Sequence, residues 1–266
     1  MNGIEGAFAR LKRDKRKALV IFLAAGDPSM KATVELVKAA ERGGADIVEI
    51  GVPFSDPLAD GPVIQESFGR AIAKGATLAR TFEMVKKIRK ESTVPLVFML
   101  TVNLVVNHGV GKFFNDCAAA GVDGIILPDA PPEEAGEFVP SARAAGLCTI
   151  MLAAPTSTTA RMKKIASIAT GFVYYITIKG VTGKTKAVPA DAARGIKSLK
   201  RLTKLPVLAG FGVTEPSQAK QMAKVSDGVI IGSQAIRVIK GAGSAKKGAD
   251  ALYKYVASVR KAIDSA

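Results

Sequence analysis

Short apolar runs rich in valine, isoleucine and leucine recur along the chain and alternate with longer amphipathic segments. The runs begin at Ala18, Ala45, Pro95, Asp123, Cys148, Phe172, Pro206 and Asp227. The segments between them, such as MKATVELVKAAERGG from Met30 and VGKFFNDCAAAG from Val110, space their apolar residues as amphipathic helices do. Near-continuous apolar strands that alternate with helices predict a parallel sheet covered by helices.

Eight such units in a chain of 266 residues predict an α/β fold, the (β/α)8 TIM barrel, which typically needs about 250 residues. We expect a single domain over residues 1–266, with an extra N-terminal helix formed by the amphipathic segment IEGAFARLK. A doubly wound open sheet is the rival fold. It is disfavoured because no Gly-x-Gly-x-x-Gly follows the first strand and no linker marks a second domain.

The chain is strongly basic, with 38 lysine and arginine residues against 23 aspartate and glutamate residues, a formal net charge of +15. Such an excess suggests nucleic acid, an anionic membrane surface or a small anionic substrate as a partner. Apart from RLKRDKRK at 10–17, the basic residues are scattered, and no tandem basic and aromatic pattern accompanies them. We therefore expect no nucleic acid and no membrane partner, which leaves the anionic substrate.

The segment KRDKRKALVIFLAAGDPS has the basic and then apolar outline of a signal peptide. Its apolar part covers only 18–25 and follows an amphipathic segment, so we interpret it as a buried first strand. No other apolar run approaches the roughly 18 residues of a membrane span. Cys117 and Cys148 match no metal-ligand spacing and are too few for a disulfide framework, so we expect no metal site and a reduced, cytoplasmic setting.

Residues at the carboxyl ends of the strands carry the chemistry in a barrel of this kind. That rule selects Asp27, Glu49, Asp56, Asp60, Asn103 and Asp129. Strand alternation places Glu49 on the same face as Ile47 and Gly51. Because a charge buried among helices would be costly, we expect Glu49 to face the mouth of the barrel. The alternative for Asp56 and Asp60 is that they only cap turns, and we keep that alternative for Asp56.

Three glycine-rich turns follow the last three predicted strands: KGVTGK at 179–184, AGFGV at 209–213 and IGSQAI at 231–236. Amide groups freed by glycine and the start of a helix together form an anion site, and barrels often bind phosphate after strands 7 and 8. Any one glycine could serve only a tight turn, but three turns at one end predict a phosphate-bearing substrate. Beside it, two carboxylates suggest acid–base catalysis by Glu49 and Asp60 in separate roles.

Other polar residues receive a plainer interpretation. His108 is the only histidine, so it cannot supply a histidine-based metal site, and we expect it near the start of a helix as a solvated or capping residue. Lys179 and Lys184 follow a strand end, where a lysine can form a Schiff base with a carbonyl substrate. Nothing else marks either lysine as reactive, so TIKGVTGKTK is interpreted as a solvated loop edge.

The motifs GVPFSDPLADGP at 51–62, GVDGIILPDAPPEE at 121–134, GVTG and GFGV, together with Glu49, resemble the α subunit of tryptophan synthase. The resemblance covers essentially the whole chain. It implies a (β/α)8 barrel that cleaves indole-3-glycerol phosphate into indole and glyceraldehyde 3-phosphate without a cofactor of its own. It also implies an αββα complex in which indole passes through a tunnel to a β subunit that holds pyridoxal phosphate.

The resemblance assigns the chemistry to two carboxylates. Expelling a carbanion from indole C3 is too costly, so C3 must first be protonated. Asp60 would stabilise the N1–H group of the resulting cation. Glu49 would be the general acid and base, taking the proton of the glycerol hydroxyl as the carbon–carbon bond breaks.

Further roles rest on the resemblance alone. Indole contacts are implied for Phe22, Leu127, Tyr174 and Phe211. Phosphate contacts are implied for Gly183, Gly212, Gly232 and Ser233. Thr182 would lock the GVTG loop over the site by bonding Asp60. The β subunit would contact Pro53, Asp56, Pro57, Asn103 and Asn107.

Two positions depart from the family pattern, because Thr101 stands where tyrosine is usual and Ala24 where threonine is usual. Both changes predict weaker positioning of the substrate rather than loss of the chemistry. They leave open a second hypothesis, a subunit that grips and activates a β partner but cleaves poorly by itself. A third hypothesis is another metal-free phosphate-sugar aldolase, which the fold alone always permits.

Overall fold

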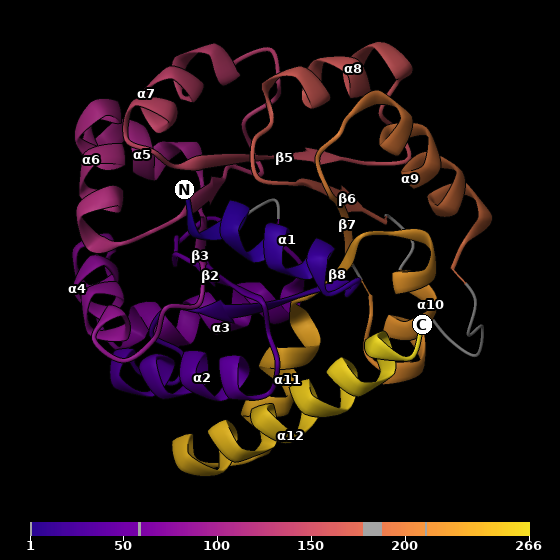
Figure 1. Ribbon diagram of the computed structural model, residues 1–266. Helices are drawn as coiled ribbons and strands as arrows, with labels where there is room; N and C mark the ends of the chain where they lie inside the picture. Colours follow the sequence, from indigo (N-terminus) through magenta and orange to yellow (C-terminus); the bar gives the residue numbers. More distant parts are fainter. Residues whose placement is uncertain (1, 58–59, 178–187, 211) are drawn as a thin grey trace.

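The computed structural model describes residues 2–57, 60–177, 188–210 and 212–266. Eight parallel strands pair in sequence order, and the last pairs with the first, so the sheet closes into a barrel (Figure 1). The strands are β1 (Ala18–Ala24), β2 (Ile47–Gly51), β3 (Leu96–Met99), β4 (Gly124–Ile126), β5 (Cys148–Ala153), β6 (Val173–Ile176), β7 (Val207–Gly210) and β8 (Gly228–Ile231). Each predicted apolar run contains one of these strands, and the predicted fold class is confirmed.

Helices form a ring outside the strands. They are α2 (Met30–Arg42), α3 (Pro62–Ala73), α4 (Leu78–Arg89), α5 (Val102–His108), α6 (Val110–Ala120), α7 (Val139–Ala144), α8 (Thr159–Ile168), α9 (Ala190–Leu202), α10 (Pro216–Val225), α11 (Ser233–Gly241) and α12 (Ala245–Asp264). No helix among the described residues is long and apolar enough to cross a membrane.

Two details of the helices have a local cause. The segment 133–146 forms a 3₁₀ turn, η1 (Ala135–Glu137), and then α7, because Pro140 lacks an N–H group and is tolerated in the first turn of a helix only. His108 ends α5 and stands two residues before α6 begins at Val110, so it lies near the start of a helix as expected. Its Nε2 atom lies 2.6 Å from Oδ2 of Asp116 in α6, so it ties two consecutive helices together.

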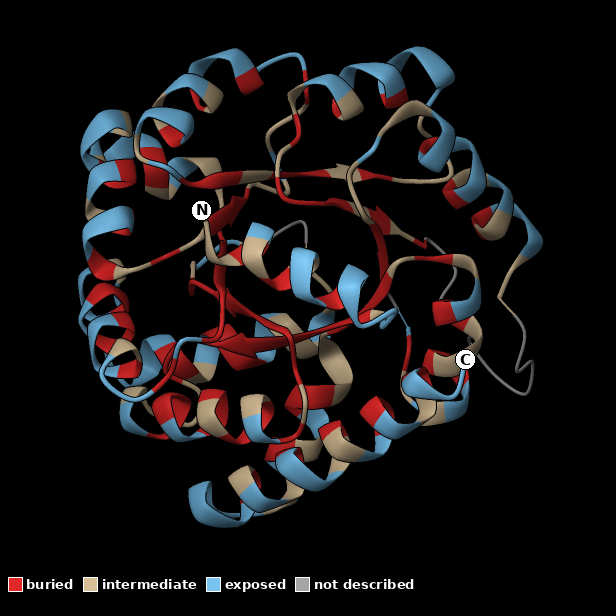
Figure 2. Cartoon of the chain, in the orientation of Figure 1, coloured by how far each residue is buried: buried red, intermediate tan, exposed pale blue. Residues whose placement is uncertain are grey.

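The strands are buried on both faces, apart from half-buried positions in β5 and β6, and their two faces belong to different cores. Val20 and Phe22 of β1 lie in a cluster inside the barrel, whereas Leu19 and Ile21 lie in the larger cluster between the barrel and the helices. Figure 2 shows the result, with buried strands at the centre and exposed positions on the outward faces of the helices. A rigid barrel wall of this kind holds the residues at its strand ends in fixed positions.

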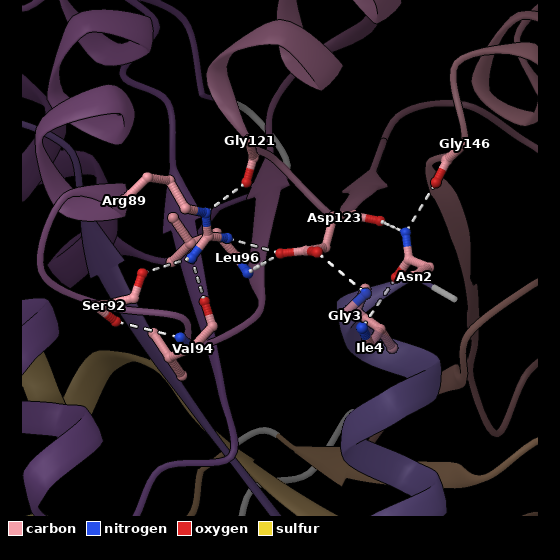
Figure 3. Close-up of polar contacts among 10 residues, drawn as sticks. All are labelled: Asn2, Gly3, Ile4, Arg89, Ser92, Val94, Leu96, Gly121, Asp123 and Gly146. Atoms are coloured by element: carbon pink, nitrogen blue, oxygen red, sulfur yellow. Dashed lines mark hydrogen bonds and ion pairs between the residues drawn. The ribbon is translucent and has the colours of Figure 1, made fainter.

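The N-terminal helix α1 (Gly3–Arg13) lies across the amino ends of the strands (Figure 1). Asn2 caps it and also donates to the carbonyl oxygens of Asp123 at 2.8 Å and Gly146 at 2.9 Å (Figure 3). The Asp123 carboxylate accepts the amide of Gly3 at 3.2 Å. A Cβ atom on Gly3 would collide with that carboxylate, so glycine is needed for the close approach.

An aspartate precedes each of three even-numbered strands, β2, β4 and β8, and makes the same two kinds of contact each time. Its carboxylate accepts an amide of the preceding strand and pairs with a basic side chain of an outer helix. The three sets are Asp46 with Leu19 and Arg260, Asp123 with Leu96 and Arg89, and Asp227 with Val207 and Lys200. Figure 3 shows the second set. We call these three sets the aspartate clamps; they fasten neighbouring strands and the outer helices at the amino end of the barrel.

Both cysteines are buried and unpaired. Cys117 lies in α6, and Cys148 begins β5. Burial raises the pKa of both thiols, that of Cys148 to about 12. Neither thiol is therefore available as a nucleophile at neutral pH.

Candidate functional site

Glu49 projects from β2 into the barrel. Ile47 lies in the inner cluster, and Val48 and Ile50 lie in the outer one, so alternation along β2 turns Glu49 inward. The residue is only 2% exposed, and its Oε2 atom has no hydrogen-bond partner among the described residues. Burial, with a smaller effect from the charge of Asp60, raises the pKa of Glu49 to about 8. The carboxyl group therefore carries a proton at neutral pH and can donate it.

Asp60 comes from the loop between β2 and α3. The loop is shaped by its own backbone, since the amide of Asp60 donates to the carbonyl of Pro57 at 3.0 Å and Gln65 donates to the carbonyl of Asp60 at 2.8 Å. Burial, with a smaller effect from the charge of Asp129, raises the pKa of Asp60 to about 6. Asp60 is thus mostly ionised at neutral pH, whereas Glu49 is mostly protonated.

Asp129, at the carboxyl end of β4, is held in place by the chain that follows β3. Its carboxylate accepts the Thr101 hydroxyl at 2.5 Å and the amide of Val102 at 3.0 Å. Thr101 is one of the two departures from the family pattern, and here its hydroxyl orients an acid beside Asp60. The sequence marked Asp129 and Thr101 separately, but their contact joins positions 28 residues apart and has no local signal.

A cavity of about 250 Å³ opens at the carboxyl ends of β2, β3 and β4. Its lining includes Thr101 and Asp129, and also four of the predicted site residues: Asp56, Pro57, Asp60 and Asn103. The structure thus brings a predicted catalytic residue and three predicted partner contacts to one hollow. Among the described residues, no group of three His, Cys, Asp or Glu side chains could hold a metal ion.

Two of the predicted indole contacts, Phe22 and Tyr174, belong to the inner cluster or pack against it. A Cβ atom on Gly51 would collide with the Phe22 ring, so the glycine of β2 makes room for that ring. Burial raises the pKa of the Tyr174 hydroxyl, and the charges of Glu49 and Asp60 raise it further, which places this ring near both carboxylates. Leu127, in contrast, packs against the outer cluster.

The predicted phosphate turns lie after β7 and β8. Gly212 has a φ of +74°, a left-handed conformation that favours glycine. Gly232 is the N-cap of α11 and Ser233 its first residue; a glycine cap has no side chain to bond the first amides of the helix. Free amides at the start of a helix suit an anion. Thr182, Gly183 and Phe211 lie outside the described residues, as do Lys179 and Lys184.

The predicted partner contacts differ in exposure. Asn103 and Asn107 are exposed on α5, whereas Pro53, two residues after β2, is buried. Asp56 is exposed and accepts the hydroxyl of Ser55 at 2.8 Å, as a turn residue would. Val106 lies between the two asparagines and is 53% exposed. Nothing in the sequence selects Val106, because an apolar residue in an amphipathic helix is expected to be buried.

Comparison with known proteins agrees with this geometry. A family model described as "Tryptophan synthase alpha chain" matches residues 8–264. The tryptophan synthase alpha chain of Geobacter sulfurreducens is 44% identical over 263 residues, covering 99% of each chain, and that of Geotalea daltonii is 45% identical over 237 residues, covering 89% of this chain and 90% of the relative.

Solved structures give the same result. The tryptophan synthase subunit alpha of Legionella pneumophila superposes with a TM-score of 0.93 at 36% identity and full coverage of both chains. A chain from the tryptophan synthase α2β2 complex of Pyrococcus furiosus superposes with a TM-score of 0.86 at 35% identity, covering 92% of this chain and 98% of that one. The chain described here belongs to the tryptophan synthase alpha chain family.

Proposed function

We propose that Glu49 and Asp60 carry out the reaction of this family, the cleavage of indole-3-glycerol phosphate into indole and glyceraldehyde 3-phosphate. Membership of the family makes the chain a lyase of tryptophan biosynthesis. The observation that supports these roles best is the buried carboxyl of Glu49, whose pKa is raised to about 8, near a second carboxyl whose pKa is about 6. Such a separation of pKa values leaves Glu49 protonated, as a proton donor, and Asp60 ionised, as a charged partner.

Glu49 begins the cycle protonated. It donates its proton to C3 of the indole, which gives a cation whose positive charge is shared with N1. The resulting carboxylate then accepts the proton of the glycerol hydroxyl next to the ring. The carbon–carbon bond breaks, its electrons return to the indole, and the hydroxyl carbon becomes the aldehyde. Glu49 ends the cycle protonated, as it began it.

Asp60 remains ionised through the cycle and accepts the N1–H group of the indole. Its charge stabilises the cation more strongly in this partly buried site than it would in water. Asp129, which accepts hydrogen bonds from the Thr101 hydroxyl and the Val102 amide, adds a second negative charge near Asp60. Together the two charges would keep the electrostatic potential negative where the cation forms.

Substrate binding would use the inner cluster and the last two strand ends. Phe22 and Tyr174 would contact the indole, and Gly212, Gly232 and Ser233 would bind the phosphate. By resemblance, Phe211 and Leu127 complete the indole contacts and Gly183 the phosphate contacts, with Thr182 closing a loop over Asp60. Leu127 would have to make its contact from the outer edge of the site, because it packs against the outer cluster.

The partner would be a β subunit. Solved relatives include the α2β2 complex of Pyrococcus furiosus and tryptophan synthase from Mycobacterium tuberculosis. We place the β contact at the mouth, through Asp56, Pro57, Asn103 and Asn107; Pro53, which the resemblance also implies, is buried and would take part only if the contact moved the chain around it. This subunit would need no cofactor of its own, pyridoxal phosphate would be held by the β subunit, and the complex would be cytoplasmic.

Indole release from indole-3-glycerol phosphate tests the proposal, with purified protein alone and after addition of a tryptophan synthase β subunit. We expect slow release that rises sharply with the β subunit. No release in either condition by a folded protein that still activates the β subunit would favour the second hypothesis, a binding subunit. Trapping of substrate on a lysine by borohydride would favour the third, a different aldolase.

A further inference from the structure

A second hollow lies at the amino end of the barrel, opposite the mouth. Its volume is about 590 Å³, within the usual range of small-molecule sites. The end of α1 and the turn that leads into β1 form one wall, and the turn between α9 and β7 forms the other. Phe8 and Leu205 belong to its apolar lining. We call this hollow the basic groove.

Six cationic side chains line the basic groove, against one carboxylate, Asp227. They are Lys12, Lys15, Arg16, Lys17, Lys200 and Lys204. Four come from the run RLKRDKRK, and two come from a segment about 190 residues away. The function proposed above makes no use of this concentration of charge.

Only part of this charge is neutralised. Lys200 pairs with Asp227 at 2.7 Å, Arg16 pairs with Asp264 at 3.2 Å, and Lys17 donates to the carbonyl oxygen of Ser226 at 2.9 Å. Lys12, Lys15, Lys17 and Lys204 have no carboxylate within 4.0 Å among the described residues, since the carbonyl that Lys17 bonds is neutral. Four cations without a paired carboxylate thus line the groove together with two paired ones.

Lys15 occupies a backbone position that a lysine adopts at a cost. Its φ is +54°, and it is the single non-glycine residue with a positive φ in the described part of the chain. The amide of Lys15 donates to the carbonyl of Lys12, and that of Arg16 donates to the carbonyl of Leu11, which is the Schellman ending of a helix. Glycine is the favoured residue at this position, so a lysine here lowers the stability of the folded protein. The same lysine adds a positive charge at the groove.

We propose that the basic groove binds a short chain of phosphate groups, either free or as the triphosphate of a nucleotide, at the end of the barrel opposite the substrate. The charges converge from two walls on one hollow, which suits an anion whose charge is concentrated over a few atoms. A nucleic-acid duplex would instead require a basic stripe that continues beyond the groove. The site is separate from the mouth and does not depend on the proposed catalytic roles.

Isothermal titration at fixed ionic strength, in EDTA, tests this site with tripolyphosphate and with ATP as probes. Saturating glycerol 3-phosphate is present throughout, to occupy the proposed phosphate site at the mouth. We expect saturable binding of one probe molecule per chain. Equal affinity for both probes would identify the phosphate chain as the ligand, and tighter binding of ATP would identify a nucleotide.

The informative variant is Lys15→Gly. It should weaken probe binding by about fivefold, as loss of one charged contact does, and raise the Tm of the free protein by about 2–4 °C, because glycine relieves the backbone. The double variant Lys12→Ala/Lys204→Ala should weaken binding by roughly tenfold or more. Its matched control, Lys246→Ala/Lys247→Ala, removes the same charge from the exposed start of α12.

Three results would overturn the proposal: no saturable binding of either probe, equal losses of affinity in the groove variants and the control, or tighter binding of duplex DNA than of both probes with the same dependence on Lys15. The first would leave the groove without a ligand of this class. The second would reduce the effect to net charge, and the third would make the surface a nucleic-acid site.

Discussion

Glu49 and Asp60 are both carboxylic acids, yet their surroundings give them opposite protonation states at neutral pH. Glu49 is enclosed by the barrel, so burial dominates and its pKa rises to about 8. Asp60 lies in a loop at the mouth and is less enclosed, so its pKa rises only to about 6. Between about pH 6 and pH 8, Asp60 is ionised and Glu49 is protonated, which are the states that the proposed mechanism requires.

The activity should therefore follow a bell-shaped curve in pH, with apparent pKa values near 6 and 8. Activity falls below the first because Asp60 gains a proton, and above the second because Glu49 loses one. Asp129→Asn should move the acidic limb to lower pH, since it removes a negative charge near Asp60. kcat/KM measured from pH 5 to 9.5 checks both limbs, and an acidic limb unmoved by Asp129→Asn would contradict the coupling.

Glu49→Gln should abolish cleavage, with a loss on the order of 10²–10⁴ in kcat or more, and leave the binding of glycerol 3-phosphate nearly unchanged. Asp60→Asn should lose less, because an amide can still accept the N1–H bond without supplying charge. Single-turnover assays and a titration with glycerol 3-phosphate separate the two effects. Collapse of binding in Glu49→Gln would make Glu49 structural.

Glu49→Gln also has a signature in stability. The folded-state pKa of about 8 lies above the ordinary value of 4.5, so the folded protein holds this proton more tightly than the unfolded chain does. The contribution of Glu49 to stability is complete below about pH 4.5 and is lost as pH rises to about 8. The variant should gain stability relative to the parent over that interval, by a few kcal/mol at most, and then level off. Urea unfolding at pH 5, 7 and 9 measures the gain; a constant difference would place Glu49 in contact with solvent.

At the scale of elements, the aspartate clamps repeat one design around the amino end of the barrel. The sequence shows their aspartates as ADIV, VDGI and SDGV, each just before an apolar run. It does not show their basic partners, because Arg89, Lys200 and Arg260 lie on helices at no fixed distance along the chain. Strands and most helices could be predicted because the periodicity that marks them is a local property of the sequence. The basic partners could not be predicted, because an aspartate clamp joins residues that are far apart along the chain.

Gly3→Ala should destabilise the protein by about 1–3 kcal/mol, because the added methyl group collides with the Asp123 carboxylate and must displace α1 or open that clamp. The matched control is Gly69→Ala in α3, where a Cβ atom meets nothing within 4 Å. Alanine there should stabilise the helix by about 0.5–1 kcal/mol. Denaturant unfolding compares them, and a Gly3→Ala variant as stable as the parent would show that α1 can shift freely.

For the whole molecule, the two ends of the barrel have separate tasks. The amino end carries the clamps, α1 and the basic groove, and the carboxyl end carries the carboxylates and the predicted partner face. Fold class and family could be predicted from the sequence because eight strand ends and the Glu49–Pro62 stretch are contiguous signals. The Asp129–Thr101 contact, the convergence of the groove walls and the exposure of Val106 depend on closure of the barrel and could not be predicted.

Val106→Asp should weaken activation by the β subunit by about tenfold, since an unpaired carboxylate would be buried at the contact, and leave indole release by the free protein unchanged. Val106 is 53% exposed on α5, between two predicted partner residues. The control is Ile72→Asp, at 38% exposure near the end of α3. If the β subunit activated both variants equally, the partner face would have to lie elsewhere than on α5.

The two buried cysteines make the protein convenient to label. Neither thiol can react with a maleimide or a disulfide reagent at neutral pH unless the structure around it opens. A cysteine introduced on the surface, for example at Asn107 in the proposed partner face or at Lys204 in the basic groove, would be the one thiol that reacts quickly. Fluorophores could then be placed at either end of the barrel without first removing the native cysteines, and slow modification of Cys117 or Cys148 would report how often α6 or β5 opens.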